Sequence, residues 1–112
     1  MCSIAQLNNV TNDIVREYRN VYGSSIDGIY LFGSYARGEA TEQSDIDIAA
    51  IVHGDRLTLQ DRLKMVWDAA ADIGLVNDVI ISPTVIPYDE FQQYKEILPY
   101  YRNISREGHK IG

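Results

Sequence analysis

The sequence predicts a small layered domain of the α/β or α+β class. Apolar residues recur at helical spacing over residues 4–21 and again over 59–73. Two segments of strand length lie between these helices: the apolar run 29–32, and residues 45–52, which alternate in their first half and are apolar in their second. Helical and strand-like segments that alternate along a chain are typical of a sheet covered by helices.

The first helix is expected to begin after Ser3. Ser3 and Gln6 have the spacing of a capping box, in which each side chain bonds the backbone amide of the other residue. The apolar positions that follow are three and four residues apart: Ile4, Leu7, Val10, Ile14, Tyr18 and Val21. Gly23 is expected to stop this helix. The run 29–32 is then expected to form a buried strand that ends at Gly33.

Residues 34–44 are polar, so we expect a turn and a loop before the second strand, 45–52. A second long helix should follow, with Thr58 as its N-cap and Gly74 as its stop. Its apolar face is formed by Leu59, Leu63, Val66, Trp67, Ala70 and Ile73.

The last part of the chain predicts a third strand and a final helix. The third strand is expected over 76–82, and Pro83 and Pro87 predict an irregular stretch after it. Apolar spacing over 91–98 indicates a final helix, which Pro99 should kink or interrupt. Because the sequence contains no internal repeat and no linker-like segment, all 112 residues are expected to form one domain.

Composition excludes several classes of function. Lys and Arg number 10 and Asp and Glu number 16, which gives a formal charge of -6. Binding to nucleic acid without sequence preference needs a basic face, so we expect no direct nucleic-acid partner. A nucleotide is still compatible with this charge if metal ions neutralise it locally. Cys2 is the single cysteine, so no intrachain disulfide can form.

The sequence gives no sign of secretion or of a membrane. Its first residues show no basic stretch followed by an apolar run, so we expect no signal peptide. The longest apolar run, 48–52, is too short to span a bilayer. We therefore expect a cytoplasmic protein.

Two carboxylates lie close together on the second predicted strand. Side chains alternate along a strand, so Asp45 and Asp47 project from one face. Carboxylates that close repel each other, and a divalent cation relieves the repulsion. Mg²⁺ prefers oxygen ligands, typically one or two carboxylates together with substrate phosphates. The pair therefore predicts a magnesium site.

A phosphate site is expected beside this pair. Gly33 and Ser34 directly follow a predicted strand, and a glycine lets a phosphate approach the backbone closely. A helical turn starting at Ser34 would present free N–H groups, and the serine hydroxyl is a further donor.

Asp78, placed at the start of the third predicted strand, could face the same metals. Three carboxylates around two ions would stabilise both oxygens of an in-line displacement. Asp78 would also be placed to take the proton of an attacking hydroxyl.

Gly33-Ser34, ten residues, then Asp45-Ile46-Asp47 resembles the G-S-x10-D-x-D signature of the DNA polymerase β-like nucleotidyltransferase superfamily. The wider run over 33–48 is similar to its minimal nucleotidyltransferase (MNT) branch. The resemblance implies that superfamily's fold, a small mixed sheet flanked by helices. It implies that Gly33 and Ser34 hold the phosphates of ATP, and that Asp45 and Asp47 bind Mg²⁺, two ions in all. Asp78 is the candidate for the third acidic residue.

Two further residues have two interpretations each. Arg37 stands where the family usually has an arginine near the phosphates, but it could instead pair with Glu39 or Glu42 on the surface. Ser44 could contact the nucleotide or only position the loop before Asp45.

Many MNT proteins are antitoxins of HEPN-domain ribonuclease toxins. The resemblance therefore implies a Mg²⁺-dependent enzyme that transfers AMP from ATP to a hydroxyl, a tyrosine of a partner HEPN toxin. It would act as the antitoxin of a type VII-like toxin–antitoxin pair, in a hetero-oligomer or a homodimer. Two alternatives stay open: a non-catalytic module that neutralises its partner by occlusion, and a small-molecule (antibiotic) nucleotidyltransferase that builds its acceptor pocket with a second chain.

Overall fold

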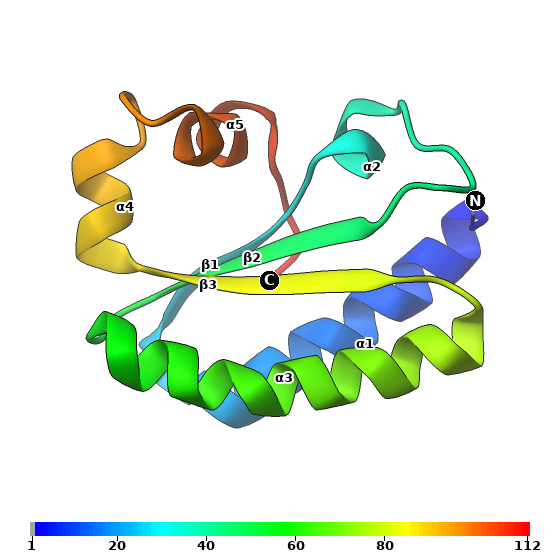
Figure 1. Ribbon diagram of the computed structural model, residues 1–112, viewed down its shortest axis with the longest axis horizontal. Helices are drawn as coiled ribbons and strands as arrows, with labels where there is room; N and C mark the ends of the chain where they lie inside the picture. Colours follow the sequence, from blue (N-terminus) through cyan, green and yellow to red (C-terminus); the bar gives the residue numbers. More distant parts are fainter. Residues whose placement is uncertain (1) are drawn as a thin grey trace.

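The computed structural model describes residues 2–112 and contains a mixed four-stranded sheet with helices on both faces (Figure 1). The strands lie in the order β3-β2-β1-β4. They are β1 (Ile26–Phe32), β2 (Ile46–Val52), β3 (Ile81–Pro87) and β4 (His109–Lys110). β1 is antiparallel to β2 and β4, whereas β2 and β3 are parallel. The predicted fold class is therefore confirmed.

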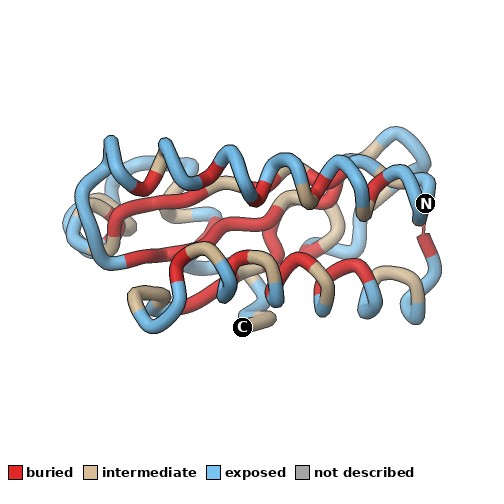
Figure 2. Tube along the Cα trace, turned by 90° about the horizontal axis from the view of Figure 1, so that it is seen from below, coloured by how far each residue is buried: buried red, intermediate tan, exposed pale blue. Residues whose placement is uncertain are grey.

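Two long helices cover one face of the sheet and three short ones lie over the other (Figure 1). The long helices are α1 (Ile4–Tyr22) and α3 (Arg56–Asn77). The short helices are α2 (Ser34–Arg37), α4 (Tyr88–Tyr94) and α5 (Pro99–Glu107). Buried positions follow the strands and the sheet-facing sides of the long helices (Figure 2). No helix within residues 2–112 is long and apolar enough to cross a membrane.

The central strand β2 is packed on both faces, which explains its apolar second half. Ile46, Ile48 and alternate residues beyond them belong to the core under α1 and α3. Ala49 and Ile51 project to the opposite face, in a smaller core with residues of α4 and α5. This alternation assigns Asp45 and Asp47 to the face of the short helices.

The first helix is found where it is expected. Ser3 is the N-cap of α1 and accepts a hydrogen bond from the Gln6 N–H at 3.1 Å. The Gln6 side chain does not return the bond, as a capping box requires, but donates to the carbonyl oxygen of Asn77 at the end of α3. Gly23 closes α1 with φ of 59°.

Both ends of the second long helix differ from the prediction. Asp55, and not Thr58, is the N-cap of α3, because its carboxylate accepts the Thr58 N–H at 3.0 Å. The helix does not stop at Gly74 but continues to Asn77. Asp78 then ends it in the left-handed conformation, with φ of 54°.

The third strand was predicted over 76–82, and this is wrong: β3 runs over Ile81–Pro87 and contains both prolines. β3 is an edge strand, and proline is tolerated at a sheet edge where its position needs no N–H bond. Pro99 does not kink a helix but begins α5, where its missing N–H has no intrahelical acceptor to lose. The predicted helix over 91–98 corresponds to α4 in its first half only.

Candidate active site

The two halves of the motif meet at one end of the β1–β2 pair. Phe32, the last residue of β1, lies opposite Asp47 near the start of β2. Gly33 follows Phe32, and α2 begins at the next residue, Ser34. Because the two strands are antiparallel, the turn after β1 is brought beside the carboxylates that open β2.

Gly33 approaches Asp47 so closely that a side chain at this position would force the Asp47 carboxylate to move. A Cβ atom built on Gly33 would collide with the Asp47 carboxylate oxygen Oδ2. The backbone of Gly33 also has φ of 74°, a region that side chains disfavour. Its carbonyl accepts the Arg37 N–H at 3.1 Å, while the first amides of α2 have no acceptor within the helix. Free amides therefore stand beside a carboxylate, as a phosphate–metal site requires.

The electrostatics of the carboxylate pair fit a divalent cation. Partial burial raises the pKa of Asp47, and the negative charge of Asp45 raises it further, while Arg37 opposes the shift. A cation between these oxygens would compensate both the lost hydration and the repulsion. Asp45 is exposed, so its oxygens remain open to an ion and to substrate phosphates.

Ser82 is a site residue that the sequence analysis missed. It is the register partner of Asp47 on β3, and its hydroxyl donates to Asp45 Oδ2 at 3.4 Å. Because β3 was predicted five residues too early, the sequence analysis did not pair Ser82 with Asp47. Correct placement of β3 would have put Ser82 beside the carboxylates.

Asp78 does not lie where it was expected. It does not open β3 but caps α3, three residues before the strand begins. Asp78 and Asp45 both line a cavity of about 890 Å³ that also borders the half-exposed Trp67. Within residues 2–112, no three acidic, histidine or cysteine side chains are grouped closely enough to hold a metal ion. The three expected carboxylates are therefore not gathered into one cluster.

Arg37 and Ser44 both make the contacts within the protein that the sequence analysis offered as the alternative to nucleotide binding. Arg37 Nε lies 3.2 Å from Glu39 Oε2, and its guanidinium also lies 3.6 Å from Glu107. Ser44 Oγ accepts the Thr41 N–H at 2.9 Å and so positions the loop before β2. Such surface pairs stabilise a fold only weakly, so they leave the Arg37 guanidinium able to turn toward a phosphate.

The family model described as "Polymerase beta, Nucleotidyltransferase" matches residues 12–99. "Putative protein adenylyltransferase MJ1305" of Methanocaldococcus jannaschii is 32% identical over 80 residues, which cover 71% of this chain and 54% of that protein. The chain thus spans about half the length of this relative.

Two solved structures share the fold. One is a crystal structure of a toxin–antitoxin with AMP-PNP, with a TM-score of 0.57, 22% identity, and coverage of 89% of this chain and 70% of that one. The other is a tri-AMPylated Shewanella oneidensis HEPN toxin in complex with MNT antitoxin. There the TM-score is 0.50 at 21% identity, with coverage of 96% of this chain and 71% of that one.

Gly33→Ala should destabilise the protein more than Gly38→Ala. Both glycines have a left-handed φ, 74° and 71°, so an added Cβ costs each site about 1 kcal/mol in backbone strain. Only at Gly33 does the Cβ also meet Asp47, because the space around Gly38 is open. We expect a loss of about 2 kcal/mol or more for Gly33→Ala in urea unfolding.

A double-mutant cycle tests the cause of that difference. Adding Asp47→Ala should remove the extra cost of Gly33→Ala, because the colliding carboxylate is gone. Equal losses for the two glycine variants would contradict the close approach of Gly33 to Asp47.

Asp47→Asn should stabilise the protein at neutral pH in a chelator. A carboxyl whose pKa is raised on folding contributes stability that is lost as the pH rises through the folded-state pKa. As the pH rises through the folded-state pKa of Asp47, the wild type should therefore lose stability relative to Asp47→Asn. In acid, the two proteins should be equally stable. Thermal unfolding across the acid-to-neutral pH range measures this difference in stability.

Asp72→Asn, on the exposed side of α3, is the control for removal of one negative charge. An Asp47→Asn protein less stable than the wild type at neutral pH would contradict the assignment.

Proposed function

Because the chain belongs to the polymerase β-type nucleotidyltransferase family, we propose that it transfers AMP from ATP to a hydroxyl group. One observation carries this proposal: the Gly33–Ser34 turn packs directly against Asp47. A backbone shaped to receive phosphate and a carboxylate that favours a cation thus occupy one end of the sheet. A metal-bound triphosphate is the ligand that needs both.

Each residue of the site has a role in this proposal. Asp45 and Asp47 hold Mg²⁺, which when bound neutralises triphosphate charge and stabilises the leaving pyrophosphate. Ser34 and the first amides of α2 bind phosphate oxygens, and Arg37 adds positive charge beside them. The Ser82 hydroxyl orients the carboxylate of Asp45.

The transfer exchanges one phosphoester bond for another. The acceptor oxygen attacks the α-phosphorus, and the bond to the oxygen that bridges the α- and β-phosphates breaks. Pyrophosphate leaves, and the hydroxyl proton passes to a base, for which Asp78 is the candidate. The residues that hold the phosphates fix the in-line geometry of this displacement, which is the main contribution a protein makes to phosphoryl transfer.

The acceptor we propose is a tyrosine of a HEPN toxin, with this chain as its antitoxin. Two findings support it: a relative carries the name of a protein adenylyltransferase, and a structure of the same fold contains an AMPylated HEPN toxin with an MNT antitoxin. A non-catalytic antitoxin would share this fold and partner, so the reaction has to be measured directly.

Purified chain incubated with Mg²⁺, α-³²P-labelled ATP and a candidate HEPN partner should label the partner. Asp47→Asn should reduce the rate by at least about 100-fold, because it removes a charge that holds the metal. Retention of most of the rate in this variant would contradict the metal assignment. Inhibition of the partner that survives Asp45→Asn and Asp47→Asn, with no label on any fraction, would favour the occlusion mechanism.

Asp78→Asn should leave the Mg²⁺ concentration dependence of transfer unchanged. Asparagine tolerates the left-handed conformation that Asp78 adopts, so the variant removes the charge and keeps the helix end. The proposed part of Asp78 in removing the acceptor proton would appear as a lower rate at saturating Mg²⁺. A higher Mg²⁺ requirement would show instead that Asp78 reaches the metal when substrate is bound.

A further inference from the structure

Helix α5 lies over the same face of the sheet as the candidate active site. Figure 1 shows α5 and α2 on one side of the sheet, opposite α1 and α3. Ile104 of α5 is fully buried in the smaller core with Phe32 and Ala49. The helix is thus anchored on the strands that carry the motif, and its last residue, Glu107, lies 3.6 Å from Arg37 of α2.

Tyr100, in the first turn of α5, stands over the point where the motif halves meet. Its ring contacts Phe32 edge to face, with ring centroids 5.6 Å apart and an interplanar angle of 86°. Phe32 is the register partner of Asp47 and the residue before Gly33. Edge-to-face aromatic pairs have a defined geometry, so the Phe32 ring fixes Tyr100 beside the phosphate turn.

Tyr100 is half-exposed on the face of the sheet that carries the carboxylates. Burial raises the pKa of its hydroxyl, the nearby Thr84 side chain opposes the shift, and the negative charge of Asp47 adds to it. Thr84 is the register partner of Ala49 and lies on the same face as Ser82. The contact with Phe32 places the ring at the end of β1, and Tyr100 as a residue is 48% exposed.

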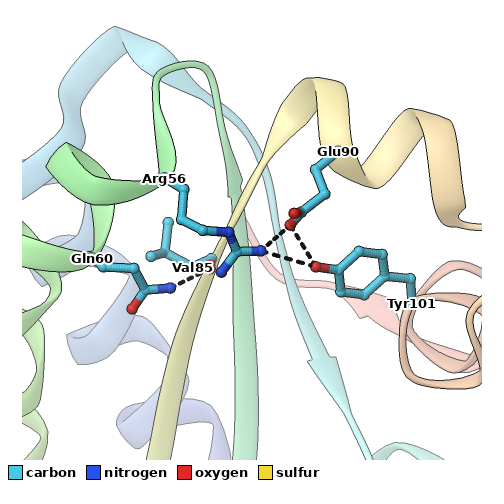
Figure 3. A network of polar contacts seen from close by, with 5 residues as sticks. All are labelled: Arg56, Gln60, Val85, Glu90 and Tyr101. Atoms are coloured by element: carbon cyan, nitrogen blue, oxygen red, sulfur yellow. Dashed lines mark hydrogen bonds and ion pairs between the residues drawn. The ribbon is translucent and has the colours of Figure 1, made fainter.

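The hydroxyl of the adjacent Tyr101 is bound to residues outside the site. Tyr101 donates from its hydroxyl to Glu90 of α4 at 2.6 Å, and Glu90 also pairs with Arg56 at the start of α3 (Figure 3). We call Arg56, Glu90 and Tyr101 the clasp. The hydroxyl of Tyr101 is thus occupied by the clasp, whereas Tyr100 lies against Phe32 beside the site.

We propose that Tyr100 is an acceptor in cis, so that the chain transfers AMP from ATP to the hydroxyl of its own Tyr100. This inference rests on the proposed AMP transfer. A bond forms between Tyr100 Oη and the α-phosphorus, and the bond from that phosphorus to the oxygen bridging the α- and β-phosphates breaks. Pyrophosphate leaves, and the hydroxyl proton passes to solvent. The AMP would remain over Asp45 and Asp47 and compete with the next ATP.

The test uses the whole chain with ATP and Mg²⁺, alone and with a HEPN partner. Intact-mass and peptide mass spectrometry should find AMP on Tyr100 in the chain alone. Tyr100→Phe keeps the ring against Phe32 and should lose at least about tenfold of the self-label. Tyr101→Phe, the matched control on the same helix, should keep it. Asp47→Asn chain mixed with active wild type should stay unlabelled, because transfer in cis cannot reach a second chain.

The outcomes separate this inference from the proposed function. Label on the partner with none on the chain itself would overturn the inference and leave AMP transfer intact. Self-label that survives Tyr100→Phe, or that appears on the Asp47→Asn chain, would also overturn it. No label on either protein would overturn both.

Discussion

The close approach of Gly33 to Asp47 is the constraint on which the rest of the site depends. The left-handed φ of Gly33 lets the chain leave β1 and begin α2 at once, and its missing side chain leaves the space that the Asp47 carboxylate occupies. One backbone conformation therefore holds together two motif halves separated by ten residues. The antiparallel pairing of β1 and β2 also brings the motif halves together, because it sets the end of β1 beside the start of β2.

The site has an energetic cost that the sheet offsets. Burial and the charge of Asp45 both disfavour the ionised form of Asp47. The same strand buries Ile48 against the long helices and Ile51 against the short ones, and each buried side chain of this size contributes about 1.5–3 kcal/mol. A one-residue slip of a strand exchanges its two faces, so packing on both sides fixes the register of β2. The apolar core thus keeps the two carboxylates on the active-site face despite their repulsion.

Features that depend on neighbours in sequence were predictable, and features set by strand pairing were not. Ser3 and Gly23 mark the ends of α1 through local capping, and the apolar run after Asp45 locates β2. The prolines of β3 predict a break by local rules, but an edge strand tolerates them, so the strand was placed too early. Ser82 lies beside the carboxylates only through the parallel register of β2 and β3, which no local pattern reveals. The motif itself was predictable, because its spacing is local.

One face of the sheet packs the larger core and the other carries the site, and the clasp connects helices on the two faces. The face under α1 and α3 is sealed by the larger core, and the opposite face carries the carboxylates under short helices. The clasp joins the start of α3 to α4 and α5 and contacts neither Asp45 nor Asp47. The position of α5 is therefore set by the clasp together with two contacts beside the site, Arg37 with Glu107 and Phe32 with Tyr100.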